Sequence, residues 1–354
     1  MIVPEVMADE PAVGDGVPAG PAPRVHGWWL GAVEVLAGAA LVLVATMVLD
    51  HATGLPRWIL GLAGGALAAR GADTLGKKVF GPRFRAGLWF SVLWLTVLIL
   101  LALFANLLPL QGPKALPLRS KSYVRPDLFS SHPLGTDGFG RDYLARLIYG
   151  SRISLIIGLG CVAVGGLIGT TVGICAGYYR ARIEKVVDVL TDALLAFPPL
   201  VFLLALVAVL RPSLLTEFVA LGALTVPTFI RLAKANTYVY AQREFVLAAR
   251  ALGTKNKRII WREIVPNVLA PLFSYAMAIV AALMIAEASL SFLGLGIKPP
   301  EPSWGNMIAD SQTVLQRDPH AVLLPAIFLF LTVLSFSRLG EVGRTRGERR
   351  QTAL

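Results

Sequence analysis

The stretch Glu244–Asn267 reads EFVLAARALGTKNKRIIWREIVPN and stands between two long apolar runs. It carries acidic and basic side chains, which are costly to remove from water unless they are paired. A polar segment of this length therefore stays in water while the runs on either side are buried. It is termed the elbow below, and its exposed side chains are available to a soluble partner.

The elbow is predicted to form two short helices. Arg243–Leu252 has small and apolar residues on one face at helical spacing, namely Phe245, Ala248, Ala249 and Leu252. Gly253 supplies the cap after this helix, because glycine enters left-handed geometry without a steric cost. The second helix, Lys255–Ile264, runs to Pro266, where the next apolar run begins.

Two interpretations of the elbow follow from these residues alone. Small side chains at Ala248 and Ala249 would let the backbone of a partner come close. An amphipathic helix lying on lipid headgroups is the alternative, and the basic and aromatic side chains of the second helix, Lys255, Lys257, Arg258 and Trp261, suit it equally.

The composition is that of a membrane protein. Hydrophobic residues make up 55% of the 354 and charged residues only 16%, against about 25% charged residues in soluble domains. The net charge of +11 comes from basic residues beside apolar runs, where topology and lipid headgroups explain them. Nucleic acid is therefore not expected as a partner.

The apolar runs predict an all-α, polytopic membrane helical bundle. A six-helix core starts near Leu88, and one or two extra membrane helices precede it. The runs are Trp29–Leu49, Trp58–Ala69, Leu88–Leu110, Ile153–Gly177, Val189–Leu210, Leu214–Ile230, Val268–Ile297 and Ala321–Phe336. Trp58–Ala69 is short for a crossing, and its small residues would pack closely on the first run.

The predicted organisation has five parts. Residues 1–25 form a disordered tail, residues 26–72 an extra membrane helix or hairpin, and residues 73–86 a basic cytoplasmic linker. Residues 87–341 form the core, with the elbow in the loop 242–266, and residues 342–354 form a basic tail. The Lys and Arg distribution places linker, elbow and tail in the cytoplasm. The side of the N-terminus depends on whether Trp58–Ala69 crosses.

Catalytic, metal and cofactor sites are not expected. Gly71–Lys78 matches the beginning of a nucleotide-binding loop, but Lys78 stands where Ser or Thr must hold magnesium, and an apolar run precedes it instead of a strand. This chain is therefore not expected to hydrolyse ATP. Cys161 and Cys175 lie in one apolar run and are interpreted as small hydrophobic residues.

Several motifs in one order resemble the C-type permease of the dipeptide, oligopeptide and nickel branch of ABC importers. In the elbow these are Ala248–Gly253 and Ile264–Asn267, although Leu247 stands where the wider family has Glu. Elsewhere the matching segments are His132–Asp142, Tyr149–Leu155, Phe197–Pro199, Glu287–Gly296 and Pro302–Asn306. The resemblance covers about Leu88 to Gly340 and leaves the two N-terminal runs unexplained.

The resemblance implies a multi-pass subunit of a prokaryotic inner membrane that imports peptides or a related small solute such as nickel. Its implied partners are a second permease, cytoplasmic ATP-binding subunits and an extracytoplasmic solute-binding protein. A secondary transporter that does not use ATP is the alternative, although the repeat expected of that class is not visible.

The resemblance, together with the chemistry of the residues, predicts roles for particular positions. The residues expected to couple to the ATPase are Phe245, Ala248, Ala249, Arg250, Leu252, Gly253, Pro266 and Asn267. Those expected to meet the binding protein on the outer side are Gly135, Asp137, Gly138, Arg141, Asp142 and Trp304. Glu287 is expected either to line the pathway or to bond between helices. Asp192 is expected on the pathway or at the start of a helix, where the dipole favours a carboxylate.

Overall fold

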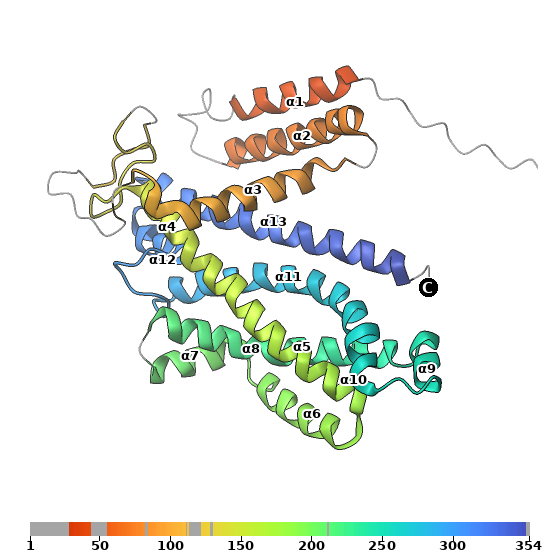
Figure 1. Ribbon diagram of the computed structural model, residues 1–354. Coiled ribbons are helices and arrows are strands. Elements are labelled where there is room, and N and C mark those ends of the chain that lie inside the picture. The colour runs from red at the N-terminus through yellow and green to blue at the C-terminus, as the bar shows by residue number, and fades with distance from the viewer. Residues whose placement is uncertain are drawn as a thin grey trace, which may run out of the picture. The chain divides into compact units, whose positions relative to one another are not determined.

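The computed structural model describes residues 28–43, 55–81, 84–110, 112, 122–127, 130–210 and 212–351. Regular secondary structure in these residues is helical, apart from one isolated β-bridge between Thr136 and Asp142. The chain divides after Ala86 into two compact units, which are described separately (Figure 1). The expected tail of residues 1–25 lies outside the described residues.

The first unit is a pair of helices, α1 (Trp28–Leu43) and α2 (Leu55–Phe80), that pack through glycines. A Cβ atom added to Gly38 would lie 2.5 Å from the carbonyl oxygen of Gly64. This confirms the close packing expected of the small residues in the second run. Whether α1 and α2 cross the membrane stays a prediction.

The nucleotide-loop match lies inside α2. All residues of Gly71–Lys78 form helical turns, whereas a phosphate-binding loop needs backbone N–H groups that are free of helical hydrogen bonds. The helix also continues to Phe80, so it includes much of the segment that was expected to be a linker.

The second unit contains the long helices. They are α3 (Ala86–Phe104), α4 (Tyr143–Leu155), α5 (Cys161–Tyr179), α6 (Ala181–Leu195), α7 (Pro199–Val209), α8 (Leu214–Tyr240), α11 (Val265–Phe292) and α13 (His320–Gln351). Shorter helices are α9 (Glu244–Ala251), α10 (Asn256–Ile259) and α12 (Trp304–Ser311), with single turns at η2 (Ala105–Leu107), η3 (Ile156–Gly160), η4 (Ile260–Ile264) and η5 (Gln312–Val314).

Five helical stretches of the described residues are long and apolar enough to cross a membrane. They are Ala86–Leu107, Tyr143–Tyr179, Leu214–Tyr240, Asn256–Phe292 and His320–Thr345. The turn between α5 and α6, the helices α9 and α10, and the end of α13 lie at one end of this unit (Figure 1). That arrangement agrees with the common side predicted from the basic residues.

The run Val189–Leu210 differs from its prediction as one membrane helix. Helix α6 ends at Leu195, and α7 begins again at Pro199. Pro198 and Pro199 lack the N–H that would continue the ladder, and the residue before a proline is pushed out of the α region. The run therefore forms two short helices that meet at a break, and it is not among the described stretches that are long and apolar enough to cross a membrane.

Helices α5 and α8 pack closely along a row of glycines, Gly165, Gly169, Gly173 and Gly177. A Cβ atom at Gly169 would lie 2.5 Å from the carbonyl oxygen of Val226, and one at Gly173 would lie 2.6 Å from that of Ile230. Without a hydrophobic driving force between helices in lipid, such close backbone approach supplies the packing energy.

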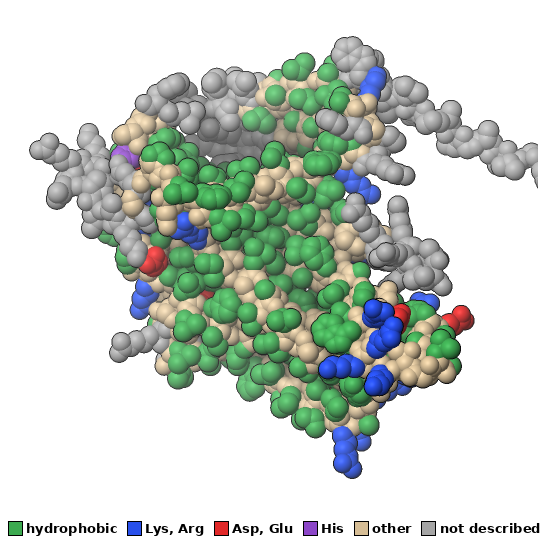
Figure 2. Space-filling view, in the orientation of Figure 1, with side chains coloured by type: hydrophobic (Ala, Val, Ile, Leu, Met, Phe, Trp, Pro, Cys, Tyr) green, Lys and Arg blue, Asp and Glu red, His purple; other side chains and the backbone are tan. Residues whose placement is uncertain are grey.

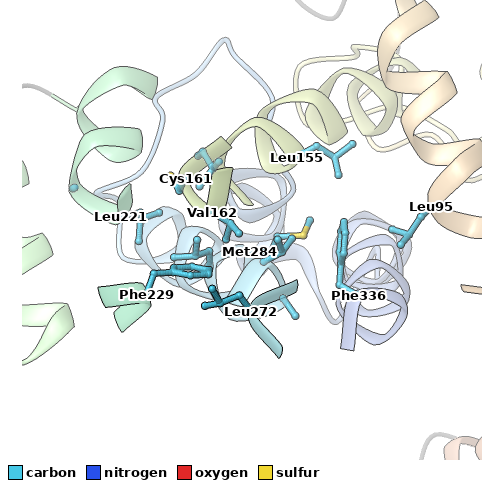
Figure 3. Packing of buried hydrophobic residues seen from close by; sticks show 14 of the residues in the cluster. Leu95, Leu155, Cys161, Val162, Leu221, Phe229, Leu272, Met284 and Phe336 are labelled. Carbon is cyan, nitrogen blue, oxygen red and sulfur yellow. The ribbon is translucent and has the colours of Figure 1, made fainter. Parts of the chain in front are cut away.

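One hydrophobic core joins the long helices of this unit. Figure 3 shows labelled side chains from α3, α4, α5, α8, α11 and α13 converging on a common centre. Met284 of α11 and Phe229 of α8 are buried there. Because α8 and α11 each lead into the elbow, this core holds both of its ends.

Candidate functional site

The first helix of the elbow, α9, turns one side toward the body of the protein. Val246 is completely buried, and Phe245 and Ala249 pack against the core cluster. Ala248 and Leu252, which were predicted on the same face, are exposed. Packing of Val246 sets the rotation of the helix, so the predicted face lies partly against the body and partly in the open.

The turn after α9 is a Schellman motif. The N–H of Gly253 donates to the carbonyl of Arg250 at 2.9 Å, and the N–H of Thr254 donates to that of Ala249 at 3.0 Å. Gly253 has a φ of +74°, which a side chain with a Cβ adopts only at a cost. The glycine cap predicted from the sequence is confirmed.

The second arm of the elbow runs into the membrane helix without a break. Helix α10 continues through the π turn η4 into α11, and Pro266 stands in the first turn of α11. Pro266 has no N–H for the helix ladder, and the side-chain amide of Asn267 donates to the carbonyl of Glu263 at 2.6 Å. Buried Ile259 and Ile264 hold this arm to the core.

Tyr178, at the end of α5, contacts both arms of the elbow. Its hydroxyl donates to Oδ1 of Asn256 at 2.8 Å, and the guanidinium of Arg250 lies 5.1 Å from the centre of its ring. The sequence interpretation did not identify Tyr178, because a tyrosine at the end of an apolar run is equally typical of a membrane interface. Tyr178 therefore links the end of α5 to both arms of the elbow.

The outward face of the elbow is apolar and basic. Leu252 is 85% exposed and Leu247 is 51% exposed. Beside Leu247 lies a cavity of about 400 Å³ that Tyr178, Arg180, Gln242 and Arg250 also line. Figure 2 shows Lys and Arg side chains gathered over α10 and beside α9. An exposed apolar surface with a basic rim is typical of a protein-interaction site.

Glu287 is fully enclosed in the bundle. Its exposed fraction is 0%, and its two carboxylate oxygens accept hydrogen bonds of 3.2 Å from Ser154 of α4 and from Ser291 of α11. Of the two roles left open by the sequence, this geometry favours hydrogen bonding between helices.

Asp192 does not stand at the start of a helix. Helix α6 begins at Ala181, and Asp192 falls in its last turn, so the capping interpretation was wrong. Its Oδ1 lies 2.5 Å from Nη2 of Arg231 in α8, and its side chain is 66% exposed. A second pair, Asp188 with Lys234 at 2.6 Å, joins the same two helices.

The segment before α4 is tied together by Asp137. Its Oδ1 accepts from the N–H groups of Phe139 and Arg141, both at 2.9 Å. Its Oδ2 lies 2.6 Å from Nε of Arg141 and 3.4 Å from Nε of Arg146. Burial raises the pKa of the nearby Tyr123 phenol, and the charge of Asp137 raises it further.

The remaining residues that were expected to contact the binding protein on the outer side also make contacts within this chain. Gly135 and Gly140 adopt φ of +81° and +76°, and Asp142 caps α4 by accepting from the N–H of Ala145 at 3.1 Å. Buried Trp304 donates to the carbonyl of Leu147 at 3.0 Å. Most residues expected to meet a binding protein are therefore buried in this chain. Gly138 is only partly buried and Phe139 is exposed, so the expected contact, which stays a prediction, would fall on this turn.

We expect Asp137→Asn to destabilise the protein by about 3 kcal/mol, because it removes the carboxylate that forms ion pairs with two buried guanidinium groups. The matched control is Asp192→Asn, whose exposed pair with Arg231 contributes below about 1 kcal/mol. Thermal unfolding of the purified variants measures both effects. Equal midpoints for the two variants would contradict the structural role of Asp137.

A second buried carboxylate, Glu217, was missed in the sequence because it stands within an apolar run. It lies in the first turn of α8, is 2% exposed, and neither of its oxygens accepts a hydrogen bond in the described structure.

Comparison with known proteins gave one family and several relatives. The family described as "Binding-protein-dependent transport system inner membrane component" matches residues 169–343. The dipeptide transport system permease protein DppC of Alkalihalophilus pseudofirmus is 38% identical over 259 residues, which cover 70% of this chain and 80% of that protein. The glutathione transport system permease protein GsiD of Pectobacterium atrosepticum is 37% identical over 212 residues, covering 60% and 70%.

Among solved structures, the inward-facing MetNI methionine ABC transporter is similar to 56% of this chain and to 97% of its own matched chain. The identity is 17% and the TM-score is 0.47.

Proposed function

The chain belongs to the family of binding-protein-dependent transport system inner membrane components, and on that premise we propose that it imports di- or oligopeptides, or a related small solute such as nickel. It is a multi-pass subunit of an ATP-driven importer in a prokaryotic inner membrane. The names of the relatives, which specify dipeptide and glutathione transport, support a peptide-like substrate.

In the proposed mechanism, one set of subunits hydrolyses ATP and another forms the solute pathway. Cytoplasmic ATPase subunits, not this chain, bind and hydrolyse ATP, and a second permease completes the pathway. An extracytoplasmic binding protein delivers the solute. ATP drives the exchange between inward-open and outward-open states because it binds one arrangement of the assembly more tightly than the other.

The observation that carries this proposal is the apolar outward face of the elbow. Leu247, Ala248 and Leu252 are exposed, while Phe245, Val246 and Ala249 fix α9 to the body. An ATPase that covers the exposed side would push on α9 as a rigid element. Tyr178 would pass the displacement to α5, and α11 would receive it through the unbroken second arm.

Site-specific cross-linking in the assembled importer tests the docking. In a background with Cys161 and Cys175 replaced by alanine, we expect Ala248→Cys labelled with benzophenone maleimide to capture an ATPase subunit. Lys185→Cys, an exposed position near the beginning of α6, is the matched control. Failure of position 248 to capture an ATPase, or equal capture from both positions, would refute the docking role.

A further inference from the structure

A long groove separates α5 from α11 on the second unit. It has a volume of about 820 Å³. One wall comes from α5, the other from α11, and Phe229 of α8 lies at the floor. Exposed Leu167 lies on the α5 wall and exposed Phe273 lies on the α11 wall. Gly166 has no side chain, so it leaves space on the α5 wall. The lining is predominantly apolar.

The groove is long enough along α5 to span the hydrocarbon of one lipid leaflet and part of its headgroup region. On α5 it extends from Val162 to Tyr179, which corresponds to roughly 25 Å at the helical rise of about 1.5 Å per residue. Half of the hydrocarbon core of a bilayer is about 15 Å thick. Because α5 and α11 both belong to membrane-length stretches, the groove has room for an acyl chain and continues into the headgroup region.

The cytoplasmic mouth of the groove carries a cation and two aromatic rings. Lys257, Trp261 and Tyr179 line it, and Trp261 is 65% exposed. Lys257 forms no ion pair with any acidic side chain among the described residues. Trp and Tyr favour the headgroup level, and cytoplasmic basic side chains attract anionic lipids.

We propose that this groove binds an anionic glycerophospholipid of the cytoplasmic leaflet, with an acyl chain between α5 and α11 and its phosphate at Lys257. The charge at the mouth selects the headgroup, whereas the apolar walls accept any acyl chain. A lipid seated there would lie against η4 and the second arm of the elbow, since Ile260, Trp261 and Val265 line the same groove. The site is independent of which solute the importer carries.

Native mass spectrometry of the purified chain tests the site. The protein is released from nanodiscs that contain equal amounts of phosphatidylglycerol and phosphatidylethanolamine, and the retained lipids are counted. We expect Lys257→Gln to lower retained phosphatidylglycerol about fivefold relative to phosphatidylethanolamine, from the usual contribution of one basic side chain. Lys255→Gln, on the same arm but outside the groove, should leave the ratio unchanged.

A second variant tests the apolar part. A Cβ atom at Gly166 would lie 3.5 Å from the ring of Phe229, an ordinary contact, so Gly166→Ala should keep both lipids. Gly166→Leu fills the groove and should release both. The proposal is overturned if Lys257→Gln retains the wild-type ratio, if Lys255→Gln changes it equally, or if Phe273→Cys in the assembled importer cross-links to the second permease while no lipid is retained.

Discussion

Replacing Leu252 with glutamate should lower ATP-driven uptake roughly thirtyfold without lowering the amount of inserted protein. The side chain is 85% exposed, so in the isolated chain its loss removes no packing. If the ATPase covers this side chain in the assembled importer, as proposed, loss of a central apolar anchor costs about 2 kcal/mol, which corresponds to that factor in rate or occupancy. A buried, unpaired carboxylate adds to the loss.

Three measurements separate docking from folding. Uptake of labelled dipeptide into proteoliposomes reports function, thermal unfolding of the isolated chain reports stability, and co-purification of the ATPase reports docking. Leu252→Met, which keeps volume and apolar character, is the control and should retain most activity. If Leu252→Glu imported normally with a bound ATPase, the exposed face of α9 would not be the docking surface.

Some features of the elbow could be predicted from the sequence, and the rotation of α9 could not. The helix, the glycine cap and Pro266 at the beginning of the next helix were predictable because each depends on local backbone chemistry. The rotation of α9 was not, since a helix of two turns has no strong periodicity and burial of Val246 depends on the distant core.

For the membrane spans, too, some features were predicted from the sequence and others were overlooked. Continuous apolar runs such as Leu88–Leu110 were identified by length and hydropathy. The break between α6 and α7 was overlooked although Pro198 and Pro199 signal it, because apolar character continues through the prolines. The glycine row on α5 was also overlooked: its spacing was visible, but its partner helix α8 was not.

Buried charge was the hardest feature to place. Asp137 and Arg141 were expected on a contact surface because they stand in a polar loop with glycines. In the structure the carboxylate of Asp137 instead satisfies two backbone N–H groups and two guanidinium groups inside the protein. Loop sequences show the charges but not the direction in which the turn points them.

Gly173→Leu should force apart the two most closely packed helices of the second unit. A Cβ atom at this position would lie 2.6 Å from the carbonyl oxygen of Ile230 and 2.8 Å from the Cβ atom of Ala233. Backbone cannot move aside as a flexible side chain does, so α8 must separate from α5. Overpacking of this kind costs about 3 kcal/mol, which should lower the unfolding midpoint by roughly 4 °C.

The matched control is Gly166→Leu, which adds the same volume on the same helix. Its added atoms enter the groove, where the Phe229 ring is 3.5 Å from the new Cβ atom, so the midpoint should change little. Because α8 leads directly into α9, Gly173→Leu should also abolish uptake in any protein that survives. Equal midpoints for the two variants would show that close contact between α5 and α8 does not hold this bundle together.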